Sequence, residues 1–270
     1  MSIAPQRFAA LNGRLSCLAA GPAEGAGVLL IHGLGWDAAR LWGAQIGALA
    51  AAGWRVLAPD LRGTGASAPL RAPVSIPDFA ADLAALLAET GMDRPVLVGF
   101  SMGCMTAVDL ALRADTRAPG VVLACGGLTA TAEGAAAVEA MIARARTLGP
   151  RTFAEEQAGA VFGPHYRATQ PEAVAAFIRW RAAMDQESLH HAFRAPRGLD
   201  YAPRLPELAT RVAVIAADTD AFLPLASARD LAEAARAPLH VIAGSGHMAP
   251  VERPDEFSGT LLGAISEVTS

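Results

Sequence analysis

The sequence contains no lysine, because all 22 of its basic residues are arginine. Schiff-base enzymes and P-loop nucleotide hydrolases each need a lysine side chain at the reacting group, so both classes are excluded. The net charge is −4, which leaves no basic surface of the kind that binds nucleic acid. We therefore expect a small-molecule substrate and no nucleic-acid partner.

Cysteine is scarce, and its three residues are Cys17, Cys104 and Cys125. They are far apart, odd in number and without C-x-x-C spacing, so buried free thiols in a reducing compartment are expected. Histidine pairs with metal-ligand spacing such as H-x-x-x-H are also missing. The sequence therefore predicts no metal site and no cofactor.

Long apolar runs are absent too. No stretch approaches about 18 apolar residues without a charge or a Gly or Pro break, and no apolar segment follows a basic start at the N-terminus. We expect a soluble cytoplasmic protein with no membrane partner. A chain of 270 residues, 53% of them hydrophobic, suits one large domain or one domain with an inserted lid, and its oligomeric state is left open.

Short apolar runs alternate with helix-like segments along most of the chain. Two runs on either side of Asn12-Gly13 predict a hairpin over residues 6–20 with a tight type I′ turn. Six further runs fit strands buried on both faces: 27–33, 53–60, 94–100, 120–125, 211–217 and 237–244. Helices are expected over 38–52, 77–90, 101–114, 225–236 and 254–268. The alternation predicts an α/β fold with a mostly parallel sheet flanked by helices.

Residues 127–205 interrupt this alternation. The segment contains no convincing strand, and four of its stretches have helical patterns separated by Gly and Pro. We therefore predict a core domain formed by residues 1–126 and 206–270. The helical segment 127–205 is predicted to be a cap, or lid, inserted in that core.

Ser101 lies in the pentapeptide GFSMG, which matches G-x-S-x-G. A predicted strand precedes it and a predicted helix follows it, and this is the context of a strained strand-to-helix turn that exposes a nucleophilic serine. The residues two before and two after the serine approach each other there, so Gly99 and Gly103 fit. On the local pattern alone, a serine that merely caps a helix is the alternative.

A serine hydroxyl needs a base and an orienting carboxylate to act as a nucleophile. His247 stands out among the six histidines because it lies in a Gly-rich loop after the last predicted strand and before the final helix. Asp218 and Asp220 both follow the predicted strand 211–217, at the sheet edge where such residues act in open α/β sheets. The residue pattern leaves either aspartate open as the acid.

In sequence order, these segments resemble the α/β-hydrolase superfamily over nearly the whole chain. The matching stretches are LLIHGLGWDAARLW, GWRVLAPDLRGTGAS, LVGFSMGCM, AADTDAFLP and GSGHMAPVERPDEF. The resemblance implies that Asp220, in its D-x-x-x-P setting, is the acid. It also implies an oxyanion hole made of the backbone N–H groups of Leu34 and Met102. His32 is then expected to brace the neighbouring loop and not to serve as a second base.

The spacing and the cap resemble 3-oxoadipate enol-lactonases and small carboxylesterases in particular. This implies serine-dependent hydrolysis of a small carboxylic ester or lactone through an acyl-enzyme. A C–C bond hydrolase, a thioesterase and a cofactor-free haloperoxidase-like enzyme use the same triad and stay open. Phe162, Trp180, His190 and Arg179 in the predicted cap are the candidate substrate-binding residues, as apolar walls or as a partner for a substrate carboxylate. Arg181 and Arg194 are the other cap arginines that could hold such a carboxylate.

Two remote alternatives belong to other classes. The stretch IHGLGWDA contains G-x-G-x-x-A after a predicted strand, and Asp60 ends the next one, which resembles a dinucleotide-binding fingerprint of an NAD-dependent oxidoreductase. That alternative leaves the settings of Ser101, Asp220 and His247 unexplained. The second remote alternative is a small-molecule receptor on the same fold. Rapid labelling of Ser101 by a fluorophosphonate would favour an enzyme over such a receptor.

Overall fold

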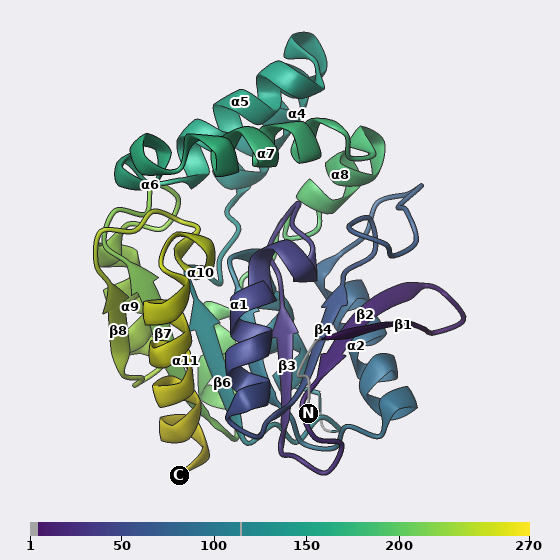
Figure 1. Cartoon of the computed structure of the whole chain (residues 1–270), viewed down its shortest axis with the longest axis vertical. Helices are drawn as coiled ribbons and strands as arrows, with labels where there is room; N and C mark the ends of the chain where they lie inside the picture. Colours follow the sequence, from purple (N-terminus) through teal and green to yellow (C-terminus); the bar gives the residue numbers. More distant parts are fainter. Residues whose placement is uncertain (1–4, 114) are drawn as a thin grey trace.

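An eight-stranded sheet runs through the centre of the computed structural model, which describes residues 5–113 and 115–270 (Figure 1). The strand order is β1-β2-β4-β3-β5-β6-β7-β8. The pairs β1–β2 and β2–β4 are antiparallel, and the other neighbouring pairs are parallel. The strands are β1 (Gln6–Ala10), β2 (Leu15–Ala20), β3 (Gly27–Ile31), β4 (Arg55–Asp60), β5 (Val96–Phe100), β6 (Gly120–Ala124), β7 (Arg211–Ala217) and β8 (Leu239–Ile242). The predicted α/β fold is confirmed.

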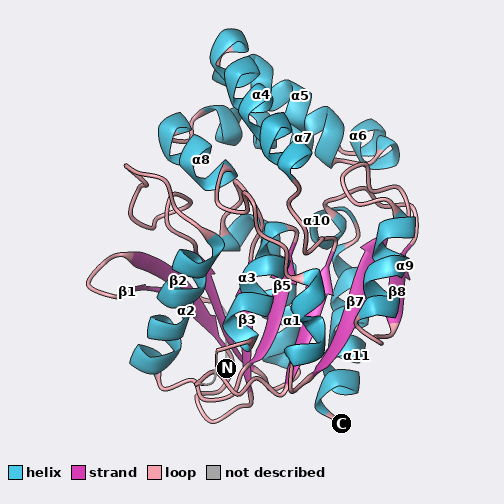
Figure 2. Ribbon diagram, turned by 180° about the vertical axis from the view of Figure 1, so that it is seen from behind, coloured by secondary structure: helices cyan, strands magenta, loops and turns pink. Residues whose placement is uncertain are grey.

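Helices cover both faces of the sheet, which is why every residue of β3, β5 and β6 is buried. On β3, Val28 and Leu30 pack towards one face, and Leu29 and Ile31 pack towards the other. Figure 1 shows α1 (Ala38–Ala51), α10 (Ala249–Glu252) and α11 (Pro254–Thr269) in front of the sheet. Figure 2 shows α2 (Ile76–Thr90), α3 (Met102–Ala111) and α9 (Leu225–Ala234) on the opposite face. The helix expected to reach residue 114 ends at Ala111, and residue 114 lies outside the described residues.

The hairpin turn is shifted by one residue from the prediction. The N–H of Gly13 donates to the carbonyl of Ala10 at 3.1 Å, so Leu11 and Asn12 are the central residues, with φ of 53° and 57°. Gly13 follows with φ of 82°, and four residues separate the strands. The prediction of a two-residue turn centred on Asn12-Gly13 is therefore wrong. The pairing of Ala10 with Leu15, both 1% exposed, fixes the register instead.

All three cysteines are free and buried, as expected. Burial raises the pKa of Cys17 and of Cys104 to about 12, so both thiols are protonated at neutral pH. Among the described residues, no helix is both long enough and apolar enough to cross a membrane.

The chain between β6 and β7 is helical. Its helices are α4 (Ala132–Leu148), α5 (Pro150–Val161), α6 (Pro164–Thr169), α7 (Pro171–Ala182), α8 (Gln186–Phe193) and the short 3₁₀ helix η1 (Ala202–Glu207). We refer to α4 to α8 as the helical insertion. Figure 1 shows it above the carboxyl ends of the parallel strands. An isolated bridge pairs Thr129, before the insertion, with Asp200, after it. The insertion therefore leaves and rejoins the core at one place.

Candidate active site

Ser101 occupies the sharp turn between β5 and α3. Its backbone has φ of 54° and ψ of −122°, a conformation that costs free energy for a residue with a side chain. The turn is held from both sides, because the N–H of Ser101 donates to Ala124 at 2.9 Å and its carbonyl accepts from the N–H of Cys104 at 3.0 Å. The predicted strand–serine–helix arrangement is confirmed.

The two flanking glycines allow this turn. A Cβ on Gly99 would lie 2.4 Å from the carbonyl oxygen of Gly103, and a Cβ on Gly103 would lie 2.4 Å from that of Ile31. Either side chain would force backbone segments apart. Glycine at both positions therefore follows from close backbone approach.

The structure brings Ser101, His247 and Asp220 together. The Ser101 hydroxyl lies 3.1 Å from Nε2 of His247, and Nδ1 of His247 lies 2.8 Å from Oδ2 of Asp220. His247 and Asp220 are each 7% exposed. Because Nδ1–H donates to the aspartate, Nε2 is free to accept the serine proton. The arrangement is chemically able to deprotonate the serine hydroxyl.

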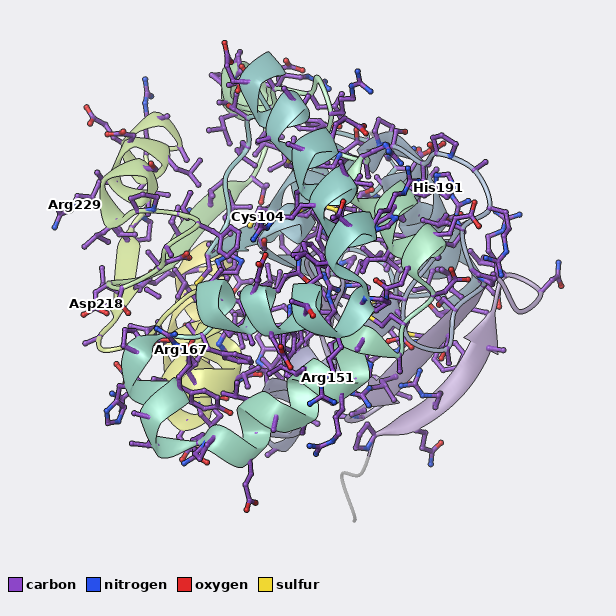
Figure 3. All side chains as sticks on the ribbon, turned by 90° about the horizontal axis from the view of Figure 1, so that it is seen from above. Cys104, Arg151, Arg167, His191, Asp218 and Arg229 are labelled. Carbon is purple, nitrogen blue, oxygen red and sulfur yellow. The ribbon has the colours of Figure 1, made fainter. Side chains whose placement is uncertain are left out.

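The two aspartates after β7 have different settings. Asp220 is buried, and its Oδ1 accepts the N–H groups of Phe222 at 2.7 Å and Leu223 at 2.9 Å, which fix the carboxylate. Asp218 is exposed at the outer edge of the molecule, where its Oδ1 accepts the N–H of Ser245 at 3.3 Å (Figure 3). The alternative left open by the sequence is therefore decided in favour of Asp220 as the neighbour of His247.

The loop after β3 runs directly beside Ser101. A Cβ on Gly33 would lie 2.8 Å from the Cβ of Ser101, and Leu34 follows as a half-buried residue. On the other side, Met102 is the first residue of α3, and the first N–H groups of a helix have no acceptor within it. The two predicted oxyanion donors thus belong to segments on either side of the serine.

His32 braces this loop from within the core. It is fully buried, its Nε2 accepts the N–H of Leu61 at 2.9 Å, and its Nδ1–H donates to the carbonyl of Gly33 at 2.7 Å. Burial lowers the pKa of His32, which keeps the ring neutral and suited to this donor–acceptor pattern. The Gly33 carbonyl belongs to the same peptide unit as the N–H of Leu34. His32 therefore fixes the direction of that N–H.

Glu252 is a site residue that sequence reasoning missed. The residue is 9% exposed, and its carboxylate accepts the N–H of Gly246, which precedes His247, at 3.0 Å. It also accepts the N–H of Gly163, between α5 and α6, at 3.1 Å. Burial raises the pKa of Glu252. The only signal in the sequence was its place five residues after His247, and the carboxylate joins the His247 loop to the helical insertion.

Asp60 is used differently from what a dinucleotide site requires. It is fully buried, and its carboxylate accepts from Nη1 of Arg7 at 2.6 Å and from the N–H groups of Ala38 and Ala66 at 2.9 and 3.0 Å. A ribose-binding acid must keep its oxygens available for the ligand. These contacts favour the hydrolase prediction over the oxidoreductase.

The four predicted substrate-binding residues have different positions. Phe162 is buried among Trp36, Tyr166 and Phe177, and thus packs the insertion onto the core. The ring of Trp180 packs against Trp36 and lies under the Arg40 guanidinium, beside an open groove of about 500 Å³ that Ser101 does not line. Both aromatic rings thus make packing contacts, and their contact with substrate stays a prediction.

His190 and Arg179 are the polar members of that set. Arg179 is exposed on α7, so the structure gives no support for its predicted contact with substrate. His190 is buried on α8, and its Nε2 has no hydrogen-bond partner among the described residues. Burial, assisted by nearby arginines, lowers the pKa of His190.

An apolar cluster beside Leu34 was not predicted. It is formed by residues of α4, α5 and α8 and of the turn before α8, and its side chains face the loop after β3. Its members are Val138, Met141, Ile142, Ala145, Phe153, Met184, Leu189 and Phe193. The helical spacing on α4 was the available signal. The cluster therefore places apolar side chains of the insertion against the loop that runs beside the serine.

Comparisons with known proteins identify the family to which this fold belongs. The model of the alpha/beta hydrolase family matches residues 28–260. A RutD protein of Variovorax paradoxus, whose name gives an unproven carbamate hydrolase activity, is 33% identical over 93% of this chain and 95% of its own.

Two solved structures are similar over their full length. The enol-lactonase from Burkholderia xenovorans LB400 has a TM-score of 0.87 and 26% identity, over 97% of this chain and 100% of that one. An esterase from Thermogutta terrifontis has a TM-score of 0.84 and 25% identity, over 99% and 100%. With the family model covering most of its length, the chain belongs to the alpha/beta hydrolase family and is a hydrolase.

Proposed function

We propose that the chain hydrolyses a small carboxylic ester or lactone with Ser101 as nucleophile, His247 as general base and Asp220 as the orienting carboxylate. The observation that carries the proposal is the hydrogen-bonded series from Asp220 through His247 to Ser101, at 2.8 and 3.1 Å. Distances of this size allow direct proton transfer. The enol-lactonase and esterase neighbours support the substrate class.

In the first step the Ser101 oxygen attacks the substrate carbonyl while Nε2 of His247 takes its proton. The carbonyl π electrons move onto the oxygen, and the N–H groups of Leu34 and Met102 stabilise that oxyanion. Collapse of the intermediate breaks the bond to the leaving oxygen, which receives the proton from His247. An acyl-enzyme on Ser101 remains, and in a lactone the leaving hydroxyl stays attached to the acyl group.

In the second step water attacks the acyl-enzyme, and His247 takes a proton from the water. The intermediate collapses, Ser101 regains its proton and the carboxylic acid is released. Asp220 stabilises the imidazolium in both steps and keeps the ring in one tautomer. No group beyond this chain and water is required by these steps.

The helical insertion serves as a cap in this proposal. The apolar cluster beside Leu34 would contact the acyl side of the substrate, because Leu34 supplies an oxyanion donor next to the acyl carbonyl. We infer a small, largely apolar acyl group. The cytoplasmic location and the small-molecule partner stay predictions from composition.

Hydrolysis of a carbamate is the second candidate. It is favoured by the RutD relative, which matches this chain over almost its full length. The same serine could attack a carbamate carbonyl, with nitrogen as the leaving atom. Thioester and C–C substrates would use the same attack.

A hydrolysis screen tests the proposal. Wild type, Ser101→Ala and the exposed control Ser266→Ala would be assayed on p-nitrophenyl esters, lactones, thioesters and carbamates. We expect ester or lactone turnover to fall at least about 10³-fold in Ser101→Ala and to be unchanged in the control. Full ester hydrolysis in Ser101→Ala would contradict the nucleophile, and turnover of carbamates alone would favour the second candidate.

A further inference from the structure

Arg181, in the last turn of α7, is a buried arginine without an acid partner. Arg181 is only 5% exposed, and it forms no ion pair with any residue that the structure describes. In contrast, Arg194 and Arg144 in the same insertion pair with Glu139 and Glu156. Burial lowers the pKa of Arg181 to about 9, which still leaves it charged at neutral pH. Burying a charge costs folding free energy, and in the absence of an acid partner the hydrogen bonds of the guanidinium must offset that cost.

The hydrogen bonds of Arg181 connect the insertion with the loop after β3. Its Nη1 donates to the carbonyl of Gly35 at 2.6 Å, and its Nε donates to Oε1 of Gln157 on α5 at 2.8 Å. The guanidinium carbon lies 5.4 Å from the centre of the Phe193 ring on α8. One side chain thus contacts α5, α8 and the loop beside the serine.

Gly35 is shaped to receive the guanidinium. Its φ is 63°, and a Cβ at this position would lie 1.5 Å from Nη1 of Arg181. The arginine therefore fills the space that a side chain would take. A hydrogen bond from a charged donor is stronger than one between neutral groups, so it holds the Gly35 carbonyl firmly.

Leu34 consequently lies between two fixed carbonyl groups. His32 holds the Gly33 carbonyl from the core, and Arg181 holds the Gly35 carbonyl from the insertion. We propose that Arg181 is a positioning residue for the oxyanion hole, through which the helical insertion sets the direction of the Leu34 N–H. This inference rests on the proposed function, because it concerns the oxyanion donor of that reaction.

The expected effect is on the rate and not on substrate affinity. Loss of one oxyanion donor typically lowers kcat about 10²- to 10³-fold, so a displaced donor should lower it by about 10- to 100-fold. A donor that acts mainly in the transition state leaves KM nearly unchanged. Arg181→Lys keeps one charged donor and should fall between wild type and Arg181→Met.

The test combines kinetics with a transition-state analogue. Arg181→Met, Arg181→Lys and Gln157→Leu would be compared with wild type and with Arg151→Met, an exposed arginine of α5 labelled in Figure 3. Each would be assayed on p-nitrophenyl acetate and for inhibition by an alkyl trifluoromethyl ketone, which forms a hemiketal oxyanion with the serine. We expect Ki to rise by the same factor as kcat/KM falls, with KM within about threefold of wild type.

Several results would overturn the inference. A folded Arg181→Met enzyme with unchanged kcat would do so, as would a loss confined to KM or a fall in kcat without a change in Ki. Circular dichroism and the melting temperature identify variants that fail to fold. If Arg181→Met does not fold, Arg181→Lys and Gln157→Leu decide by the same criteria. Ester hydrolysis that persists in Ser101→Ala would instead refute the proposed function and this inference with it.

Discussion

Asp220 and His247 are joined by a hydrogen bond of 2.8 Å between Oδ2 and Nδ1. Asp220→Asn keeps the shape but removes the charge that stabilises an imidazolium, and its amide can hold the ring in the wrong tautomer. We expect kcat on p-nitrophenyl acetate to fall by about 10²- to 10⁴-fold. The matched control is Asp218→Asn, which alters only an exposed contact with Ser245. Full activity in Asp220→Asn together with a loss in Asp218→Asn would assign the role to Asp218.

Glu252 should affect the rate through the His247 loop. In Glu252→Gln, one oxygen can still accept an N–H, but the amide NH₂ cannot accept from the N–H of Gly246 or Gly163. The loop before His247 would then shift, and we expect kcat/KM to fall by about 3- to 30-fold, since small displacements of a base are costly. Glu256→Gln, at an exposed site on α11, is the control. Equal activity of both variants in the ester assay would show that the carboxylate does not position the base.

Burial of neutral His32 predicts a pH dependence of stability. Its pKa is lowered in the folded state, so the unfolded chain binds a proton more readily when the pH falls below about 6.5. The stability that this residue contributes is thus present above about pH 6.5 and is lost as the pH falls towards the lowered value, by up to about 1.4 kcal/mol per pH unit.

The check is the free energy of unfolding by urea between about pH 7 and pH 5. Wild type should lose more stability across this range than His32→Asn. Replacement of the exposed His165 by Asn should leave the wild-type slope unchanged. A His32→Asn protein with the same slope as wild type would contradict the prediction.

Phe222 is a large hydrophobic residue that is 57% exposed, and its ring centre lies 5.1 Å from that of His247. An exposed aromatic ring beside the base is suited to contact the substrate. We expect Phe222→Ala to lower kcat/KM for p-nitrophenyl butyrate by about 3- to 10-fold, mainly through KM, because up to about 1.5 kcal/mol of apolar contact is lost. Val241→Ala, at the other large hydrophobic residue that is exposed in the described part of the chain, is the comparison. A change in melting temperature without a change in KM would indicate a packing role alone.

That Ser101, His247 and Asp220 lie together could be predicted because their signals are local. Ser101 has a strand before it, a helix after it and glycines two residues away on both sides, and Asp220 and His247 each lie in the loop that follows a strand. Parallel strands bring their carboxyl ends to one edge of the sheet, so sequence order was enough to suggest that the three meet.

The roles proposed for Arg181 and Glu252 could not be predicted because they depend on contacts between distant segments. Arg179, Arg181 and Arg194 were the arginines considered for a substrate carboxylate, but the sequence did not indicate a contact of Arg181 with Gly35. Residues 179 and 181 are separated by a rotation of about 200° around the helix axis, and the packing of α7 buries Arg181 while Arg179 stays exposed. Val174, Phe177 and Ile178 form a short apolar stripe on α7 that Arg181 continues, but this spacing does not reveal which loop the arginine contacts. The substrate contact of Phe162 stays a prediction for a similar reason, since an aromatic residue beside a helix can face either a ligand or its neighbours, and its ring packs against Trp36, Tyr166 and Phe177.

The conformation of Ser101 has a consequence for how this protein can be stabilised. Its φ of 54° is unfavourable for a residue with a Cβ, and the rest of the fold must compensate for that cost. Relaxing the turn would make the chain more stable and would at the same time withdraw the hydroxyl from His247. If Ser101 is the nucleophile as proposed, searches for heat-resistant variants should therefore select for retained turnover as well as for stability, because a more relaxed backbone at this position opposes catalysis.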